Sequence, residues 1–326
     1  MKKLIYILVC HSIAFCDFGG GYAGSILRHG SSAREISLAN SLVATENPGF
    51  NAFSNPSILG NIKNLEFGTS VFSLSHNRNL QAISICKNLP PSAGAGISFL
   101  RGGINSIVGI NSDEFFVGDM NFSEGYLMLS FGVKLNRLLS FGINGKSLFQ
   151  RYSLSTDEKY MSRGISLDFG IRSNPFDNID IGIQIESLFG EYNWNQSVSS
   201  SSVPYRESIP KRYVYGLSYY PTSKCQLLFQ GEHLSIPDGY MSKRLSGGLE
   251  YQLHIIDNVN PIFLRFGLKQ TRWLETDQIS VQQLILPSAG IGIVLKLFNK
   301  FSINLDYAIH SSNIGINNLF SFNTEI

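Results

Sequence analysis

The chain has 326 residues, of which 15% are charged and 12% aromatic, and its net charge is +2. The charged fraction is well below the roughly 25% of soluble domains, and the cations are scattered instead of forming a nucleic-acid-binding patch. Mean hydropathy is +0.04, and after the N-terminus no run reaches the roughly 18 apolar residues of a membrane-spanning helix. The composition therefore excludes helical membrane spans and gives no indication of a nucleic-acid partner.

Residues 1–16 have the pattern of a secretory signal peptide. Lys2 and Lys3 form a positive n-region, a short apolar stretch follows, and Ala14-Phe15-Cys16 is similar to an A-x-A-like cleavage site. We therefore expect export, with cleavage directly after this tripeptide. The alternative is a lipoprotein anchored through Cys16, although a lipobox places a small residue where this chain has a phenylalanine.

Residues 17–63 are patterned differently from the rest of the chain. Ser31 is a candidate helix cap, and four apolar residues after it share one helical or irregular face: Ile36, Leu38, Ala39 and Leu42. Asn55-Pro56-Ser57 then indicates a turn. The segment is too short for an independent domain, so we expect it to fold as a plug into the mouth of a barrel formed by the residues that follow.

Residues 64–326 alternate between apolar and polar positions with a period of two, which predicts strands with one apolar and one polar face. About fourteen strands are expected, each long enough for the roughly 9–11 residues of a tilted membrane strand. Their approximate starts are Asn64, Asn79, Ser92, Gly125, Arg137, Met161, Asn178, Lys211, Lys224, Ser242, Pro261, Pro287, Lys300 and Gly315.

The apolar face requires either a second sheet, as in a soluble sandwich, or lipid, as in a transmembrane barrel. The charged strand residues decide between them, because nearly all fall on the polar face, and a hydrated barrel interior accommodates such a wall. The residues expected to point inward are Glu66, Lys134, Lys146, Asp168, Arg172, Asp180, Glu186, Arg212, Glu232, Arg244, Glu250, Arg265, Lys269, Lys296 and Asp306.

The connections between strands alternate in length, which is typical of outer-membrane barrels with tight periplasmic turns and longer loops at the cell surface. Leu135-Asn136 and residues 174–177 are examples of the short turns. Residues 102–124 and 190–210 are examples of the connections expected to be long loops.

Two parts of the chain resemble the opening and closing motifs of the PorV/PorQ family. The matching residues are Leu27, Arg28, Gly30, Ala33, Arg34, Asn55 and Pro56 at the start, and Leu305, Asp306, Tyr307 and Ala308 near the end. The resemblance implies a closed antiparallel transmembrane β-barrel of about 14 strands, related to the FadL-like transporters. Its expected parts are a signal peptide (1–16), an N-terminal plug (17–63) and the barrel (64–326).

The resemblance also implies two possible functions in the bacterial outer membrane. The first is a non-enzymatic docking component of type IX secretion, because this family engages the C-terminal domains of secreted cargo. The alternative is a passive FadL-like transporter of hydrophobic small molecules, with the plug as its gate. The expected partners are outer-membrane lipid, the barrel assembly machinery, and secretion-system subunits or cargo domains.

Catalytic and cofactor motifs are not found in the sequence. It contains neither Gly-x-Ser-x-Gly nor His-Glu-x-x-His, and residues 19–24 match G-x-G-x-x-G but follow an export signal instead of a strand. Asp306 and His310 form the nearest acid/base pair, but on one strand they lie about 13 Å apart. No spacing indicates zinc or calcium. We therefore expect no enzymatic activity, metal or cofactor.

Arg28 and Arg34 are the candidate functional cations of the plug. We expect them to pair with inward-facing acids such as Asp180, Glu186 or Asp306. The stronger interpretation is that they fix the plug to the barrel wall, and the alternative is a direct functional role.

Overall fold

The computed structural model describes residues 22–110, 116–154, 159–198, 201–235, 241–253, 261–271, 273–274, 285–297, 301–312 and 314–326. The expected signal peptide and its cleavage site lie outside these residues. None of the helices in the described part of the chain is long and apolar enough to cross a membrane.

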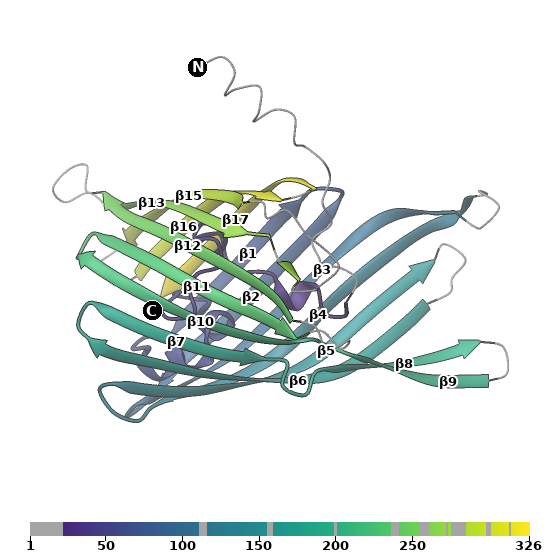
Figure 1. The fold of residues 1–326 in the computed structure, drawn as a ribbon, viewed down its shortest axis with the longest axis horizontal. Helices are drawn as coiled ribbons and strands as arrows, with labels where there is room; N and C mark the ends of the chain where they lie inside the picture. The colour runs from purple at the N-terminus through teal and green to yellow at the C-terminus, as the bar shows by residue number, and fades with distance from the viewer. Residues whose placement is uncertain are drawn as a thin grey trace, which may run out of the picture.

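In the described part of the chain, 14 antiparallel strands close into a barrel (Figure 1). Each wall strand pairs with the next one, and the first pairs with the last, which closes the sheet. The wall strands are β1 (Glu66–Leu74), β2 (Arg78–Leu89), β3 (Ala93–Ile110), β4 (Phe116–Lys134), β5 (Leu139–Leu154), β6 (Lys159–Phe176), β7 (Ile179–Glu186), β10 (Lys211–Thr222), β11 (Cys225–Ser235), β12 (Met241–Leu253), β13 (Ile262–Gln270), β15 (Ile285–Leu297), β16 (Phe301–Ser312) and β17 (Gly315–Glu325). The fold class predicted from the alternation is therefore confirmed.

Three further strands extend this wall: β8 (Glu191–Val198), β9 (Ser201–Ser208) and β14 (Trp273–Leu274). The β8–β9 hairpin pairs with β6 and projects beyond the barrel in Figure 1. The tight turns, such as the one between β4 and β5, lie at the opposite rim, which we call the short-turn rim.

Two segments that we expected to be long loops form strands instead. Residues 102–124 lie mostly in β3 and β4, and residues 190–210 contain β8 and β9. Continued strand pairing satisfies backbone hydrogen-bonding groups that an irregular loop would leave to water. The hairpins therefore extend well past the points at which turn-forming residues had suggested that the strands end.

The two faces of the wall carry opposite kinds of side chain. Outward-facing residues are mostly large and apolar, as in Ile97, Leu129 and Ile165, which are 58%, 60% and 65% exposed. The expected inward charges are buried at Glu66, Lys146, Asp168, Arg172, Asp180, Glu186, Arg212, Glu232, Arg244, Glu250, Arg265 and Asp306. Lys134 and Lys269 are half-buried, and the side chain of Lys296 lies outside the described part of the structure.

Residues 22–63, which we call the N-terminal segment, contain only short helices. These are η1 (Ile26–Arg28), α2 (Ala33–Ser37), α3 (Asn51–Ser54) and η2 (Pro56–Asn61). Ser32, not the expected Ser31, caps α2 by accepting a hydrogen bond from the Glu35 backbone N–H. Glu35 in turn accepts hydrogen bonds from Ser31. The cap prediction was one residue early because both serines contribute to this capping arrangement.

Candidate functional site

The N-terminal segment packs against the inner face of the barrel wall. α2 contacts β13, β15, β16 and β17, while η2 contacts β2 to β6. Leu27, Ala33 and Ile36 are buried in one cluster with wall residues that include Met128 and Ala308. The Ala33 backbone N–H also donates to Ser321 Oγ at 3.1 Å. The opening and closing motifs of the sequence therefore meet between α2 and β16.

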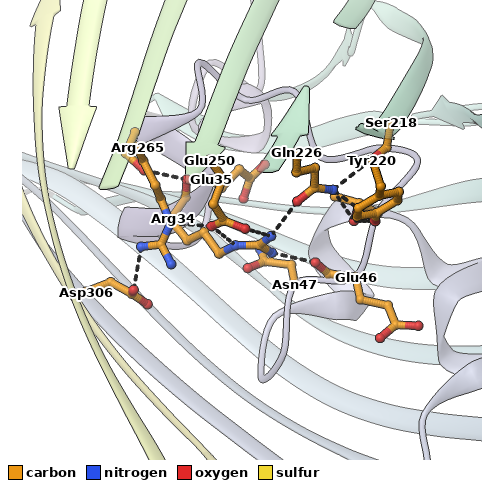
Figure 2. Close-up of polar contacts among 12 residues, drawn as sticks. Arg34, Glu35, Glu46, Asn47, Ser218, Tyr220, Gln226, Glu250, Arg265 and Asp306 are labelled. Atoms are coloured by element: carbon orange, nitrogen blue, oxygen red, sulfur yellow. Dashed lines mark hydrogen bonds and ion pairs between the residues drawn. The ribbon is translucent and has the colours of Figure 1, made fainter. Parts of the chain in front are cut away.

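Arg34 fixes α2 to the wall through a two-pronged ion pair (Figure 2). Its Nε and Nη2 atoms each lie 2.8 Å from a carboxylate oxygen of Glu250 on β12. It also donates to the Glu46 carbonyl at 2.5 Å and to Gln226 Oε1 at 3.3 Å. Burial alone would lower the pKa of Arg34, but the Glu250 carboxylate raises it above its ordinary value. Glu250 thus replaces the three acids that we had expected as partners.

The ion pair continues along the wall to the closing motif. Arg265 Nε lies 2.5 Å from Glu250 Oε2, and Arg265 Nη1 lies 2.6 Å from Asp306 Oδ1. The strand between Arg265 and Asp306 presents Gly292, whose added Cβ would lie 2.6 Å from Arg265 Nη1. Asp306 is therefore a paired structural carboxylate, connected to Arg34 through two other charged side chains.

Most of the other buried inward charges are paired in the same way, whereas Glu66 accepts hydrogen bonds from the Gly49 N–H at 2.9 Å and from Asn51 Nδ2 at 2.8 Å. Lys146 pairs with Asp168 at 2.7 Å, and Arg172 with Asp180 at 2.8 Å. Arg212 contacts Glu186 and Glu232 at 2.9 and 2.8 Å, and Arg244 also pairs with Glu232. Pairing of this kind offsets the cost of placing many charges in a barrel interior with little water.

A row of glycines makes room for η2. The row consists of Gly94 on β3, Gly132 on β4, Gly142 on β5 and Gly170 on β6. Each glycine lies directly opposite the next one on the neighbouring strand. A Cβ added to Gly142 would lie 2.5 Å from the Pro56 carbonyl oxygen. Because only glycine permits this close approach, the row fixes where η2 crosses the barrel.

Asn55 and Pro56 form the start of η2. The Asn55 side-chain carbonyl accepts hydrogen bonds from the Ser57 N–H at 3.1 Å and the Ser57 hydroxyl at 2.7 Å. Its amide donates to the carbonyls of Val43, Ile171 and Ile183 at 2.8 to 3.4 Å. The turn predicted here is therefore capped by a side chain that also bonds the segment to β6 and β7.

Arg28 lies apart from Arg34. Its guanidinium folds back on its own segment and donates to the carbonyls of Ala23 at 2.9 Å and Tyr22 at 3.4 Å. The neighbouring His29 is buried, and burial lowers its pKa to about 4, so the imidazole is neutral at pH 7. Gly30 packs closely, since an added Cβ would lie 2.7 Å from Ile36 Cδ1.

The remaining motif residues, Leu305 and Tyr307, face away from the segment. Leu305 is 44% exposed, and the Tyr307 ring packs on Phe320 with centroids 4.8 Å apart. Only Asp306 and Ala308 of the closing motif point toward the N-terminal segment.

Sequence reasoning missed Glu124, which is 1% exposed and belongs to the inner face of β4. It accepts hydrogen bonds from Gln150 Nε2 at 2.7 Å and from the Tyr192 hydroxyl at 2.8 Å. The alternation in the sequence could have identified it, because Glu124 lies two residues before Tyr126 and four before Met128, which are both inward positions.

A cavity of about 20 Å³ between the segment and the wall has a mostly polar lining that includes His29, Glu35, Glu186 and Arg212. This volume accommodates about one water molecule. This cavity is therefore too small for an organic solute.

The pairing of the wall is irregular next to this cavity. β7 ends at Glu186, Ser187 adopts a φ of +58°, and regular pairing with β6 resumes only at Glu191. The Ser187 N–H donates to Asp168 Oδ1 at 3.1 Å, which holds the distorted backbone against the inner face. The wall backbone is therefore kinked at this point, while the Leu188 N–H still donates to the Leu167 carbonyl of β6 at 2.9 Å.

Neither known protein families nor curated proteins match the sequence, but solved structures match the fold. The toluene transporter TbuX of Ralstonia pickettii superposes with a TM-score of 0.65 at 9% identity, covering 91% of this chain and 98% of the other. The monoaromatic hydrocarbon channel CymD gives 0.63 at 11%, with 91% and 96% covered. A FadL homologue of Pseudomonas aeruginosa gives 0.62 at 12%, with 90% and 98% covered.

The chain therefore shares its fold with these three proteins. These three neighbours are described as channels or transporters or by their relation to FadL, and none as a secretion component. The comparison gives no support to the type IX docking function that the sequence resemblance implied first.

Proposed function

We propose that this chain is a passive outer-membrane channel for hydrophobic small molecules, with the N-terminal segment as its gate. The observation that carries the proposal is a closed barrel whose interior is filled by a segment lying beside a kink in the wall. Two neighbours are described as a toluene transporter and a monoaromatic hydrocarbon channel, which supports aromatic hydrocarbons as the first solutes to test.

The apolar outer wall supports an outer-membrane location, because exposed Leu, Ile and Phe side chains at this density suit acyl chains and not water. The paired interior charges leave no continuous apolar tunnel in the described closed arrangement. Passage of a solute therefore requires part of the segment to move, and the polar contacts of Arg34 and Asn55 set the free-energy cost of that movement.

A reversible crosslink tests the gate. Ser41 Oγ of the segment donates to Ser246 Oγ of β12 at 3.1 Å, so cysteines at both positions lie within disulfide reach. In a background with the free Cys86 and Cys225 replaced by serine, we expect oxidation of Ser41→Cys/Ser246→Cys to abolish toluene uptake by cells that express the chain. Reduction should restore uptake.

The matched control crosslinks two wall strands and leaves the segment free. Ser98 Oγ donates to Ser84 Oγ at 2.9 Å between β3 and β2, and oxidation of Ser84→Cys/Ser98→Cys should leave uptake unchanged. If the wild-type chain adds no toluene uptake to the host, the channel proposal is wrong. If the locked segment still permits full uptake, the gate proposal is wrong.

A further inference from the structure

Three arginines point outward from neighbouring strands of the wall. Arg101 lies on β3, Arg151 on β5 and Arg163 on β6, and all three side chains are exposed. Arg101 and Arg163 lie at the same level of the wall, because Arg101 is opposite Gly125 on β4, Gly125 is opposite Phe149 on β5, and Phe149 is opposite Arg163. Arg151 lies two residues further along β5. Three strand spacings place Arg101 and Arg163 roughly 14 Å apart, with Arg151 between them. We call these residues the arginine triad.

The triad adjoins the apolar outer face on its short-turn side. On β3, Ile97 and Phe99 precede Arg101 on the outer face, and on β6, Ile165 and Leu167 follow Arg163 toward the short-turn rim. A cation on the lipid-facing wall costs most at the bilayer midplane and little at the interface. The triad therefore belongs at the interface on the side of the long hairpins, which is the cell-surface side of an outer-membrane barrel.

The charges of the triad are not paired with any side chain in the described part of the chain. Among the side chains that the structure describes, none forms an ion pair or hydrogen bond with Arg101, Arg151 or Arg163. The nearest outward-facing acid by register is Glu191, opposite Ile165, and it pairs with Arg206 at 3.9 Å. Within the described part of the wall, these three guanidinium groups thus face outward without a paired carboxylate.

An apolar platform adjoins the cations. The rings of Phe99 and Phe149 stack with centroids 6.0 Å apart and an interplanar angle of 15°. Gly125 on the strand between them makes this possible, because an added Cβ would lie 2.7 Å from Phe149 Cζ. Cations above a flat aromatic surface complement a molecule with a phosphorylated head and acyl chains.

We propose that the arginine triad binds the phosphate groups of the phosphorylated saccharolipid in the outer leaflet. Guanidinium groups recognise phosphate oxygens with two parallel hydrogen bonds, which a lysine ammonium does not reproduce. The acyl chains of the same lipid pack on Phe99 and Phe149. This site lies on the outer wall and is independent of the proposed channel function.

Lipid binding to the purified full chain in detergent micelles tests the proposal. The probes are bisphosphorylated lipid A, enzymatically dephosphorylated lipid A and phosphatidylglycerol, with affinity measured by titration in native mass spectrometry. We expect the triple variant Arg101→Gln/Arg151→Gln/Arg163→Gln to bind bisphosphorylated lipid A about 100-fold more weakly than wild type, as for three lost surface cations. High salt should weaken wild-type binding in the same direction.

The matched control removes three exposed cations from the short-turn side: Lys63→Gln/Lys87→Gln/Lys224→Gln. It should retain wild-type affinity. Equal affinity of wild type and the triad variant would overturn the proposal, and so would equal wild-type affinity for lipid A with and without phosphate or for phosphatidylglycerol. Heat-dependent gel mobility reports whether each variant is folded, and the wild-type comparison of the three lipids tests phosphate recognition without any variant.

Discussion

At the scale of single residues, Arg34 is the cation that most directly joins the N-terminal segment to the barrel. Its guanidinium and the carboxylate of Glu250 are largely buried, with side-chain exposures of 13% and 10%. A charge at such a position depends on its partner, because its hydration is lost on folding. Arg265 shares the same carboxylate, so removal of Arg34 leaves Glu250 with one cation.

Replacing Arg34 with alanine should lower the free energy of unfolding by about 2–3 kcal/mol, somewhat less than the loss for a fully isolated buried charge. It should also increase protease cleavage of residues 22–63 in membranes. Urea unfolding in lipid vesicles and limited proteolysis measure both effects. Arg137→Ala is the control, since its pair with Asp177 is 84% and 95% exposed and should contribute less than about 1 kcal/mol. Unchanged stability and protection in Arg34→Ala would contradict this role.

At the scale of elements, the position of η2 depends on shape complementarity with four strands. The row of Gly94, Gly132, Gly142 and Gly170 forms a shallow inner surface on which the helix backbone rests. The Asn55 side chain then bonds η2 to the strands on one side. Packing and side-chain hydrogen bonds to the wall backbone, not ion pairs, hold this end of the segment.

Gly142→Ala should displace η2 and lower the free energy of unfolding by about 1–3 kcal/mol, as expected for overpacking. A cysteine introduced at Ser57 would become more reactive toward a water-soluble thiol reagent in the same variant. Gly145→Ala on the same strand is the control, because its added Cβ would meet only Leu167 Cδ2 at 3.9 Å. If both variants show equal labelling and stability, the glycine row does not position η2.

At the scale of the whole molecule, the barrel separates its two environments strand by strand. Large apolar side chains cover the outside, while paired charges and the N-terminal segment fill the inside. A sandwich would instead bury its apolar side chains between two sheets. The closed cyclic pairing removes free strand edges from the membrane, where unpaired backbone groups are costly.

This orientation predicts how an outward charge acts at different depths. Leu129 lies on the outer face of β4, between the short-turn rim and the level of Gly125, and is 60% exposed. Leu129→Arg should lower the free energy of unfolding in lipid vesicles by about 2–4 kcal/mol. Leu138→Arg, in the turn between β4 and β5 and 50% exposed, should cost about 0–1 kcal/mol at the interface. Equal costs at the two positions would show that the outer face does not meet acyl chains.

The sequence by itself determined the strand pattern and the direction of most side chains. A period of two assigns every residue of a strand to one face, so a local pattern suffices to predict that Glu250, Arg265 and Asp306 point inward. Tertiary structure decided which of them meet. The partner of Arg34 lies 216 positions away, and the closure of the barrel and the fit of η2 on the glycine row select it from many inward acids. Contacts between residues so far apart in the sequence depend on how the strands stagger around the barrel. Alternation along a single strand does not encode that stagger.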